Sequence, residues 1–201
     1  PDSAIHIRLL RVFRINKSST EPNVRCQLTT WPEDSAPSYY AISYTWGDPL
    51  LRTDILVNGK RMRVRQNCEY VLKQAFWQGG SRYHWVDAIC INQDDLEEKA
   101  EQVARMATIF SKALRVLACV GKHADGSKSF FRFVRKHAES FSRHAQSHTD
   151  QDYIGEGLTW WLLFFRPWKI PSLSKRLQVF LQRGYFTRLW VFQELFHARA
   201  V

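Results

Sequence analysis

The chain has 201 residues, of which 45% are apolar and 24% are charged. This composition suits one domain with one sizeable core, and it excludes wholesale disorder. Lys and Arg number 29 against 19 Asp and Glu, which gives a formal charge of +10. Such a surplus favours an anionic partner, namely nucleic acid, acidic lipid or a phosphate-bearing small molecule, or it is only a solvated basic surface.

Cysteine spacing and apolar run length narrow the class of protein further. Cys26, Cys68, Cys90 and Cys119 show neither C-x-x-C nor zinc-finger spacing, so we expect reduced, mostly buried thiols and no metal site. No apolar run approaches the ~20 residues that span a bilayer, and the first residues lack the features of a secretory signal. We therefore expect a cytoplasmic protein without a transmembrane segment. The last residues run out of a periodic segment, which indicates a piece excised from a longer protein.

The first third of the chain reads mainly as strands. Apolar alternation predicts strands over residues 5–13, 24–30 and 40–45. Residues 54–57 and 60–64 flank Asn58-Gly59, the strongest two-residue hairpin signal, because both turn positions need positive φ.

The middle of the chain predicts a strand–helix–strand unit. A helix over 67–77 precedes a compact apolar run at 84–90 that we interpret as a buried strand. Asp94, with Glu97 three residues later, predicts the N-terminus of an amphipathic helix that leads into a second buried strand over 114–120. Two strands joined by a helix imply parallel pairing.

The last third reads as helical. Amphipathic or apolar helices are predicted over 127–141, 174–181 and 186–199, and residues 158–165 form an aromatic, apolar stretch. The predicted fold class is therefore α/β: a mainly parallel sheet flanked by helices, with an added β-hairpin and a helical C-terminal part.

Three sequence blocks carry a resemblance. They are Tyr40-Ala-Ile-Ser-Tyr-Thr-Trp-Gly-Asp-Pro49, the segment from Trp85-Val-Asp-Ala-Ile-Cys-Ile-Asn-Gln-Asp94 to Val120-Gly121, and Tyr185-Phe-Thr-Arg-Leu-Trp-Val-Phe-Gln-Glu194. In order and spacing they resemble the three signature blocks of the fungal heterokaryon incompatibility (HET) domain, so residues 1–201 are expected to form a single such domain. Cys119 departs from the pattern, since the family often has tryptophan there.

The resemblance implies an effector of programmed cell death in fungal non-self recognition, often fused to or working with regulatory NTPase and repeat modules. HET domains also resemble TIR domains, which have a parallel α/β core. Some TIR domains cleave NAD, whereas others only assemble signalling complexes. NAD is thus an expected substrate, and no cofactor is expected.

Glu194 is the candidate catalytic residue. Cleavage of a nicotinamide–ribose bond builds positive charge on the ribose, and a carboxylate at that face stabilises the transition state. Trp190 lies four residues earlier, on the same face of a helix, and could form a wall for the nicotinamide ring. Arg188 is a further substrate-binding candidate, because phosphates need cations or donors. The alternative is structural: Trp190 packs in the core, and Glu194 caps a helix or pairs with Arg188.

Further substrate-binding candidates follow two predicted strands. Ser43, Tyr44 and Trp46 end one strand, and Asp87 and Asn92 flank the end of another; ligands of open α/β sheets gather at such ends. The alternative for the first group is a turn in which Trp46 packs, and for Asp87 a structural hydrogen-bond hub.

Other functions compete with this enzyme. Cys90 could be a nucleophile with His84, although most buried cysteines are inert. The aromatic residues between 160 and 168 could instead form a self-associating or partner-binding face. A weaker alternative is an effector that targets nucleic acid or lipid through its basic surface.

Overall fold

The computed structural model of the chain describes residues 4–15, 22–79, 82–136 and 170–201. It divides into two compact units, each described by itself below. The sheet unit comprises Pro1–Gly121 and Arg188–Val201, and the helical unit comprises Lys122–Thr187.

The sheet unit is built on seven strands in the order β5-β4-β2-β1-β6-β3-β7. The strands are β1 (His6–Ile15), β2 (Val24–Pro32), β3 (Tyr39–Tyr44), β4 (Arg52–Val57), β5 (Lys60–Arg65), β6 (Tyr83–Trp85) and β7 (Arg115–Cys119), and a short 3-10 turn, η1 (Glu33–Ser35), follows β2.

The sheet is mixed, whereas the sequence predicted a mainly parallel one. β3 runs parallel to both β6 and β7, and β2 runs parallel to β4. The pairs β1–β2, β1–β6 and β4–β5 are antiparallel. The predicted parallel character therefore holds for the three-stranded part formed by β6, β3 and β7, as a strand–helix–strand crossover requires.

The predicted hairpin is confirmed as β4–β5. Asn58 and Gly59 have φ of 51° and 77°, the positive values that the tight turn demands. The Asn58 side chain also ties the turn to β2: its Oδ1 accepts from Leu28 N at 2.9 Å, and its Nδ2 donates to Leu28 O at 3.0 Å. The hairpin is thereby fixed beside β2.

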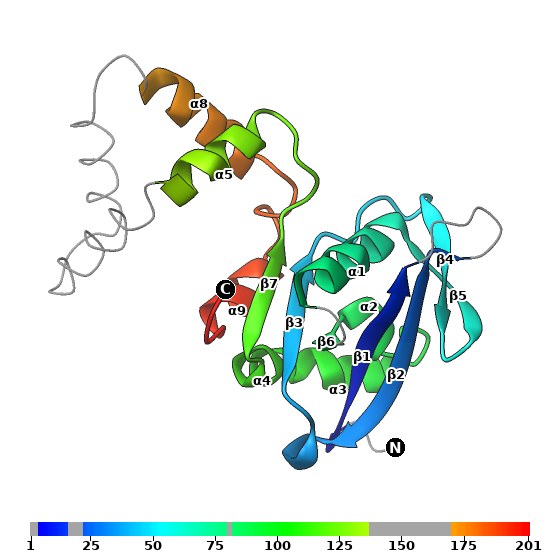
Figure 1. Cartoon of the computed structure of the whole chain (residues 1–201). Helices are drawn as coiled ribbons and strands as arrows, with labels where there is room; N and C mark the ends of the chain where they lie inside the picture. Colours follow the sequence, from blue (N-terminus) through cyan, green and yellow to red (C-terminus); the bar gives the residue numbers. More distant parts are fainter. Residues whose placement is uncertain (1–3, 16–21, 80–81, 137–169) are drawn as a thin grey trace, which may run out of the picture. The chain divides into compact units, whose positions relative to one another are not determined.

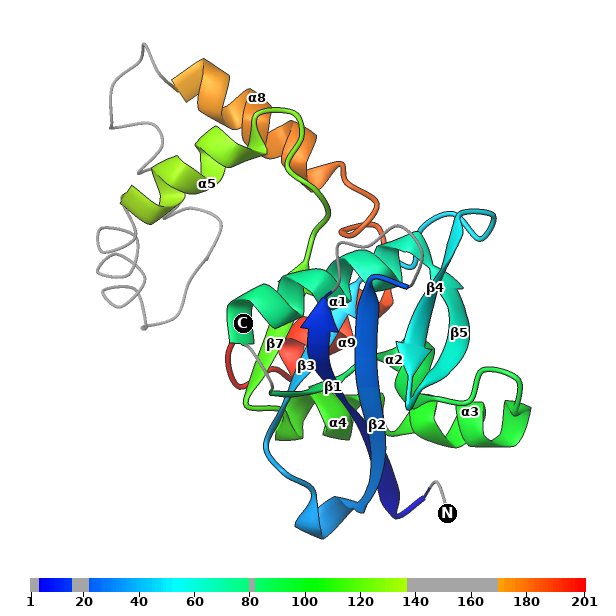
Figure 2. The same ribbon diagram turned by 45° about the vertical axis from the view of Figure 1, so that its right-hand side comes forward.

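The helices of this unit are α1 (Gln66–Gly79), α2 (Asp87–Cys90), α3 (Leu96–Ala104), α4 (Met106–Lys112) and α9 (Trp190–Phe196). α1 confirms the helix predicted over 67–77; it lies across the sheet and contacts β1 to β5 (Figures 1 and 2). α4 and α9 pack together near β7. After α9, Val116 N of β7 donates to Ala200 O at 2.8 Å, so the chain end covers an otherwise open strand edge.

Two predicted segments are wrong in form. Residues 84–90 were predicted to be one strand, but β6 ends at Trp85 and the chain turns into α2. The Val86 carbonyl accepts from Ile89 N and Cys90 N, which closes this helical turn, and Asp87 is its first residue. The final helix, predicted over 186–199, covers only Trp190–Phe196.

The amphipathic helix after residue 94 is present but divided. Asp95, not Asp94, caps α3, because its carboxylate accepts from Glu97 N and Glu98 N. Arg105 separates α3 from α4 with φ −89° and ψ −2°. Its guanidinium bonds to the Glu33 carboxylate and to His6 O, so a long-range ion pair holds the break in place.

The helical unit contains α5 (Ser127–Lys136) and α8 (Ile170–Leu181), which contact each other. The rings of Phe130, Phe131 and Phe180 pack edge-to-face or tilted, with centroids 5.2–5.6 Å apart. The helix predicted over 174–181 is confirmed within α8, and that over 127–141 is confirmed as far as Lys136; residues 137–141, like the aromatic stretch between 158 and 168, lie outside the described residues. Within the described ranges, no helix combines the length and apolarity needed to cross a membrane.

Candidate functional site

A polar cluster with a buried centre lies where the parallel strands β3 and β6 end. We call it the carboxylate cluster and define it as Ser43, Trp46, Asp87, Arg188 and Glu194. Ser43 and Trp46 come from the end of β3, Asp87 follows β6, and Arg188 and Glu194 belong to the segment containing α9. Five of the predicted site residues thus meet at the edge of the sheet where ligands of α/β folds gather.

Glu194 is the centre of this cluster. Its side chain is buried, with 2% of the residue exposed, and its Oε2 accepts from the Ser43 hydroxyl. Arg188 Nη2 donates to Glu194 Oε1 at 3.2 Å. Arg188 Nη1 is buried without a hydrogen-bond partner among the described residues. The ion pair anticipated as the structural alternative therefore exists, yet it leaves one buried guanidinium nitrogen unused, and such a group normally has a partner.

Asp87 is a hydrogen-bonded hub. Its Oδ2 accepts from Trp46 Nε1 at 2.7 Å and its Oδ1 accepts from Ala88 N at 2.7 Å. Burial raises the pKa of Asp87 to about 6; the bonds from Trp46 and Ala88 oppose the rise, and the charge of Glu194 adds to it. The charge of Glu194 therefore acts on Asp87 and favours its protonated form.

Tyr44 extends the cluster toward α1. Its side chain is buried beside Cys68 and Asp87, and burial together with the Asp87 charge raises the pKa of its hydroxyl well above 10. Tyr44 is therefore a neutral donor at every physiological pH.

Asn92 and Trp190 are more exposed than the residues of the carboxylate cluster. Asn92 is exposed, and its backbone N–H donates to Glu98 Oε1 at 2.7 Å. Trp190 is the first residue of α9 and is 44% exposed, so it is not a core residue, while Glu194 on the next turn is buried. The shared helix face predicted for Trp190 and Glu194 does not give them a shared environment.

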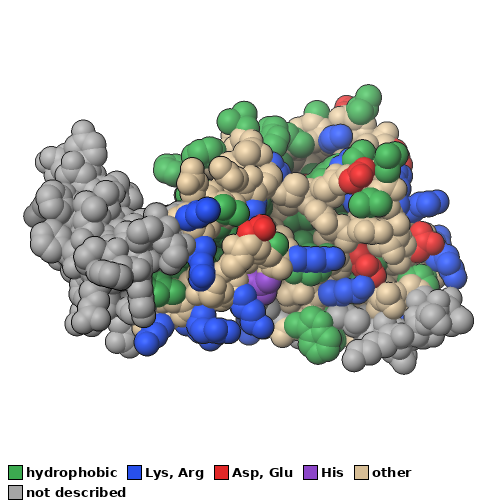
Figure 3. Space-filling view, turned by 90° about the horizontal axis from the view of Figure 1, so that it is seen from above, with side chains coloured by type: hydrophobic (Ala, Val, Ile, Leu, Met, Phe, Trp, Pro, Cys, Tyr) green, Lys and Arg blue, Asp and Glu red, His purple; other side chains and the backbone are tan. Residues whose placement is uncertain are grey.

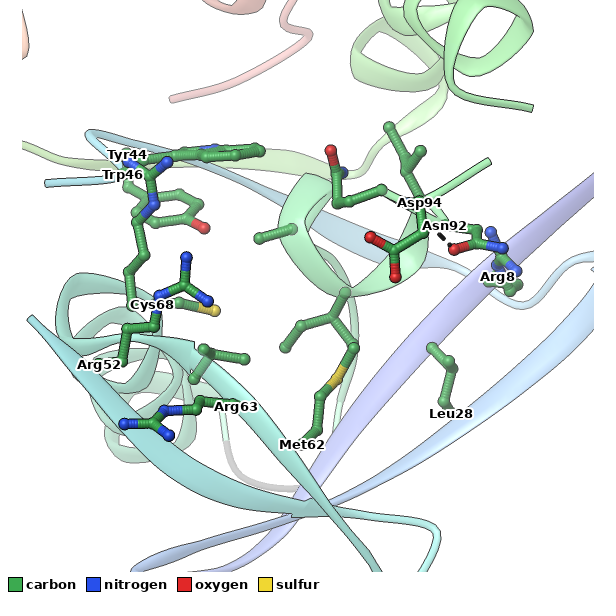
Figure 4. Close-up of a pocket in the computed structure, with 16 residues that line it drawn as sticks. Arg8, Leu28, Tyr44, Trp46, Arg52, Met62, Arg63, Cys68, Asn92 and Asp94 are labelled. Carbon is green, nitrogen blue, oxygen red and sulfur yellow. Dashed lines mark hydrogen bonds between the residues drawn. The ribbon is translucent and has the colours of Figure 1, made fainter. Parts of the chain in front are cut away.

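A cavity of about 510 Å³ adjoins the cluster (Figure 4). Tyr44, Trp46, Arg52 and Cys68 lie at one end, and Arg8, Asn92 and Asp94 lie at the other. Ser43, Asp87 and Glu194 do not line it. Trp46 connects the two places, because it lines the cavity while its indole nitrogen bonds to Asp87.

Basic side chains are numerous on the described surface. Viewed from above, the surface shows Lys and Arg side chains in several groups, with fewer and more scattered acids (Figure 3). Within the part of the chain that the structure describes, no group of three His, Cys, Asp or Glu could hold a metal ion. The side chains that meet at this edge include carboxylates, an arginine and an aromatic ring.

Cys90 does not have the environment of a nucleophile. All four cysteines are free thiols; Cys26, Cys68 and Cys90 are buried and Cys119 is half-buried, as the sequence predicted. Burial raises the pKa of Cys90 to about 12, and its Sγ accepts from Val86 N at 3.4 Å. The thiolate needed for attack is therefore absent at neutral pH.

Sequence reasoning missed the arginines of the hairpin. Arg52, Arg63 and Arg65 line the cavity, and all three come from β4 or β5. The signal was present in Lys60-Arg-Met-Arg-Val-Arg65, where basic and apolar residues alternate as they do on a strand with two different faces. The hairpin was predicted, but no binding role was attached to it.

Comparison with known proteins places this arrangement in a family. The family described as heterokaryon incompatibility protein (HET) matches residues 39–194, which span the ends of β3 and β6 and the segment carrying Glu194. The chain belongs to this family.

One curated relative is heterokaryon incompatibility protein 6, OR allele, of Neurospora crassa. It is 29% identical over 219 residues, which cover 96% of this chain and 32% of that protein. The chain thus spans about a third of the length of the relative. No solved structure matches the chain.

Proposed function

We propose that the chain is an effector domain of heterokaryon incompatibility that triggers fungal programmed cell death by hydrolysing NAD at the nicotinamide–ribose bond. Membership of the HET family and the name of the Neurospora crassa relative support the biological role. The observation that carries the chemistry is the buried Glu194, held by Ser43 and Arg188 at the strand ends beside a second carboxylate.

The proposed reaction requires only NAD, water and the Glu194 carboxylate. The bond between ribose C1′ and the nicotinamide nitrogen breaks, and its electron pair leaves with nicotinamide. Water adds to C1′ and releases one proton, so the products are ADP-ribose, nicotinamide and a proton. The Glu194 carboxylate stabilises the positive charge that develops on the ribose. This electrostatic stabilisation is strongest in a site of low dielectric constant.

Ser43 and Arg188 position that carboxylate. The Ser43 hydroxyl donates to one oxygen of Glu194, and Arg188 donates to the other. These two bonds fix the plane of the carboxylate. Arg188 Nη1, which has no hydrogen-bond partner among the described residues, supplies a donor for a substrate oxygen. Trp46, held by Asp87, provides the aromatic wall.

Incubation of the purified chain with NAD tests this proposal. We expect nicotinamide release with the wild type, and loss of at least a hundredfold with Glu194→Gln, since one preorganised charged group typically contributes that much. Gln keeps the shape and an oxygen for Arg188. The matched control is Glu97→Gln, an exposed acid in the first turn of α3, which should leave the rate unchanged.

Circular dichroism and the unfolding midpoint establish that Glu194→Gln is folded. A folded wild type that releases no nicotinamide at any protein concentration contradicts the proposal. So does a folded Glu194→Gln variant with the rate of the wild type.

A second candidate function is self-association through α9, favoured by an exposed apolar face. Leu189, Phe192 and Phe196 are 80%, 73% and 85% exposed, and their spacing puts them on one side of the helix, opposite the buried Val191 and Glu194. Light scattering over a concentration series tests it. Phe192→Ser should lower the apparent mass if this face associates, whereas Leu50→Ser, an equally exposed residue outside the face, should not. A wild type that stays monomeric contradicts this function.

A further inference from the structure

The cavity beside the carboxylate cluster has two chemically different ends joined by an apolar middle. Its walls come from β1 and β2, the end of β3, the β4–β5 hairpin, the start of α1, and α2 with the segment that follows it. A volume of about 510 Å³ lies within the range of small-molecule sites.

Unpaired positive charge is concentrated at one end. Arg52 and Arg65 face each other across the hairpin in direct register, and like charges in that position repel. Neither forms an ion pair with any residue that the structure describes. By contrast, Arg8 at the opposite end is neutralised by Glu98. The hairpin therefore maintains a charge repulsion that a bound anion would relieve.

These two guanidinium groups are oriented by the protein. Arg65 Nη1 donates to Gly47 O at 2.9 Å, and its guanidinium lies over the Trp46 ring at 4.9 Å from the centroid. Arg52 Nε donates to Pro49 O at 3.0 Å, which leaves its two terminal nitrogens available. Arginine forks held in this way match the oxygens of a phosphate.

The rest of the cavity suits an aromatic body. Met62 lies between the two ends (Figure 4), Val64 and Ile89 add apolar lining, and Trp46 offers a ring. Asn92 and Asp94, at the end opposite to Arg52, offer hydrogen-bonding groups (Figure 4). A planar heterocycle with polar edges, joined to a phosphate, would use every part of this lining.

We propose that the cavity binds a nucleoside phosphate, with the phosphates at Arg52 and Arg65 and the base over the apolar middle. Binding itself needs no catalysis. The further identification of this ligand with the ADP half of NAD rests on the proposed function, because Trp46 then joins the cavity to the Asp87–Glu194 carboxylates where the nicotinamide ribose would lie.

Calorimetric titration of the 201-residue chain with ADP, adenosine and inorganic pyrophosphate tests the proposal. ADP should bind at least tenfold more tightly than either fragment, since only ADP engages both the arginines and the apolar middle. Arg52→Ala should weaken ADP binding at least tenfold and leave adenosine binding unchanged, because the loss of one charge-assisted bond has about this effect. Arg52→Lys should recover part of the loss.

Arg61→Ala is the matched control. Arg61 is an exposed arginine of β5 that pairs with Asp54 and does not line the cavity, so its removal should leave ADP affinity unchanged. Equal weakening by Arg52→Ala and Arg61→Ala overturns the proposal in favour of diffuse surface charge, and pyrophosphate binding as tightly as ADP overturns the role of the apolar middle. Absence of ADP binding to the wild type at millimolar concentration overturns it altogether. ADP binding without NAD hydrolysis leaves this site standing and refutes the proposed function.

Discussion

His84 and Asp87 lie three residues apart and are both perturbed by burial, in opposite directions. His84 is fully buried in β6, and burial lowers the pKa of its imidazole from 6.5 to about 4. The unfolded chain therefore binds more protons there between pH 4 and 6.5, so this group removes stability as the pH falls. Asp87, whose pKa is raised from 3.8 to about 6, does the reverse, because the folded state binds its proton first.

The two contributions to the free energy of unfolding offset each other between pH 4 and 6. Asp87→Asn removes the contribution of Asp87, so the contribution of His84 should become measurable. We expect the free energy of unfolding to fall by about 2 kcal/mol more in the variant than in the wild type between pH 7 and 4.5, from the linkage of each pKa to stability. Urea denaturation at both values measures this difference. A variant with the same pH dependence as the wild type would show that Asp87 has an ordinary pKa.

For single residues, the sequence predicted which residue types lie near strand ends, but it did not predict which side chains bond to each other. Ser43 was correctly expected near the end of a parallel strand. Asp87 was predicted within the apolar run 84–90, and it follows β6 only because that strand ends at Trp85. The bond between Ser43 and Glu194 joins residues 151 apart, and only the packing of α9 decides it. The four-residue spacing of Trp190 and Glu194 was misleading, because Trp190 begins its helix and lies at the exposed end.

Among the elements, two turns that need glycine differ in their surroundings. Gly59 in the hairpin has φ of 77° and nothing near the position of a Cβ. Gly47, after β3, has φ of 78°, and a Cβ there would lie 2.6 Å from Asn67 Nδ2. That amide donates to Thr45 O at 3.0 Å, so it cannot move without losing a bond that ties α1 to the turn.

Gly59→Ala should therefore cost about 1 kcal/mol of unfolding free energy, which is the strain of a left-handed backbone alone. Gly47→Ala should cost about 2–4 kcal/mol, because a steric clash is added to the same strain. Chemical denaturation of both variants measures the difference, with Gly184→Ala as an unstrained reference. Equal losses at Gly47 and Gly59 would show that Asn67 yields freely.

The apolar run at 84–90 shows a limit of predicting secondary structure from the sequence. A buried strand and a buried helical turn have the same continuous apolar pattern, so periodicity does not separate them. Asp87 was the available clue, since an acid is favourable in the first turn of a helix, and its side chain does accept from Ala88 N. The hairpin was predictable because the Asn-Gly dipeptide fixes its geometry locally.

For the whole molecule, the common direction of β6 and β7 and the antiparallel β4–β5 hairpin were predictable, and the other strand pairings were not. The strand–helix–strand pattern requires β6 and β7 to run alike, and the structure inserts β3 between them. The antiparallel pairing of β1 with β2 and β6 depends on long-range packing, which strand-length patterns do not encode. The HET resemblance, confirmed by the family match, came from the order of the motifs. That order can be recognised without knowing how the strands pair.

The net charge of +10 should act on a charged substrate at the level of the whole chain. We expect affinity for ADP to fall severalfold between 50 and 200 mM NaCl, because salt screens both the arginine end of the cavity and its basic surroundings. Affinity for uncharged adenosine should change little over the same range. Calorimetry at the two salt concentrations measures both affinities. Equal salt dependence for ADP and adenosine would show that the positive charge of the chain does not strengthen ADP binding.

The Glu194 carboxylate of α9 is proposed to stabilise the charge that develops on the ribose as the nicotinamide–ribose bond breaks. The most direct measurement is a proton NMR time course of NAD with the folded wild type, Glu194→Gln and Glu97→Gln at equal concentration. We expect free nicotinamide with the wild type and Glu97→Gln, and none above background with Glu194→Gln. Unchanged NAD in the wild-type sample, or equal nicotinamide release in all three, would contradict it.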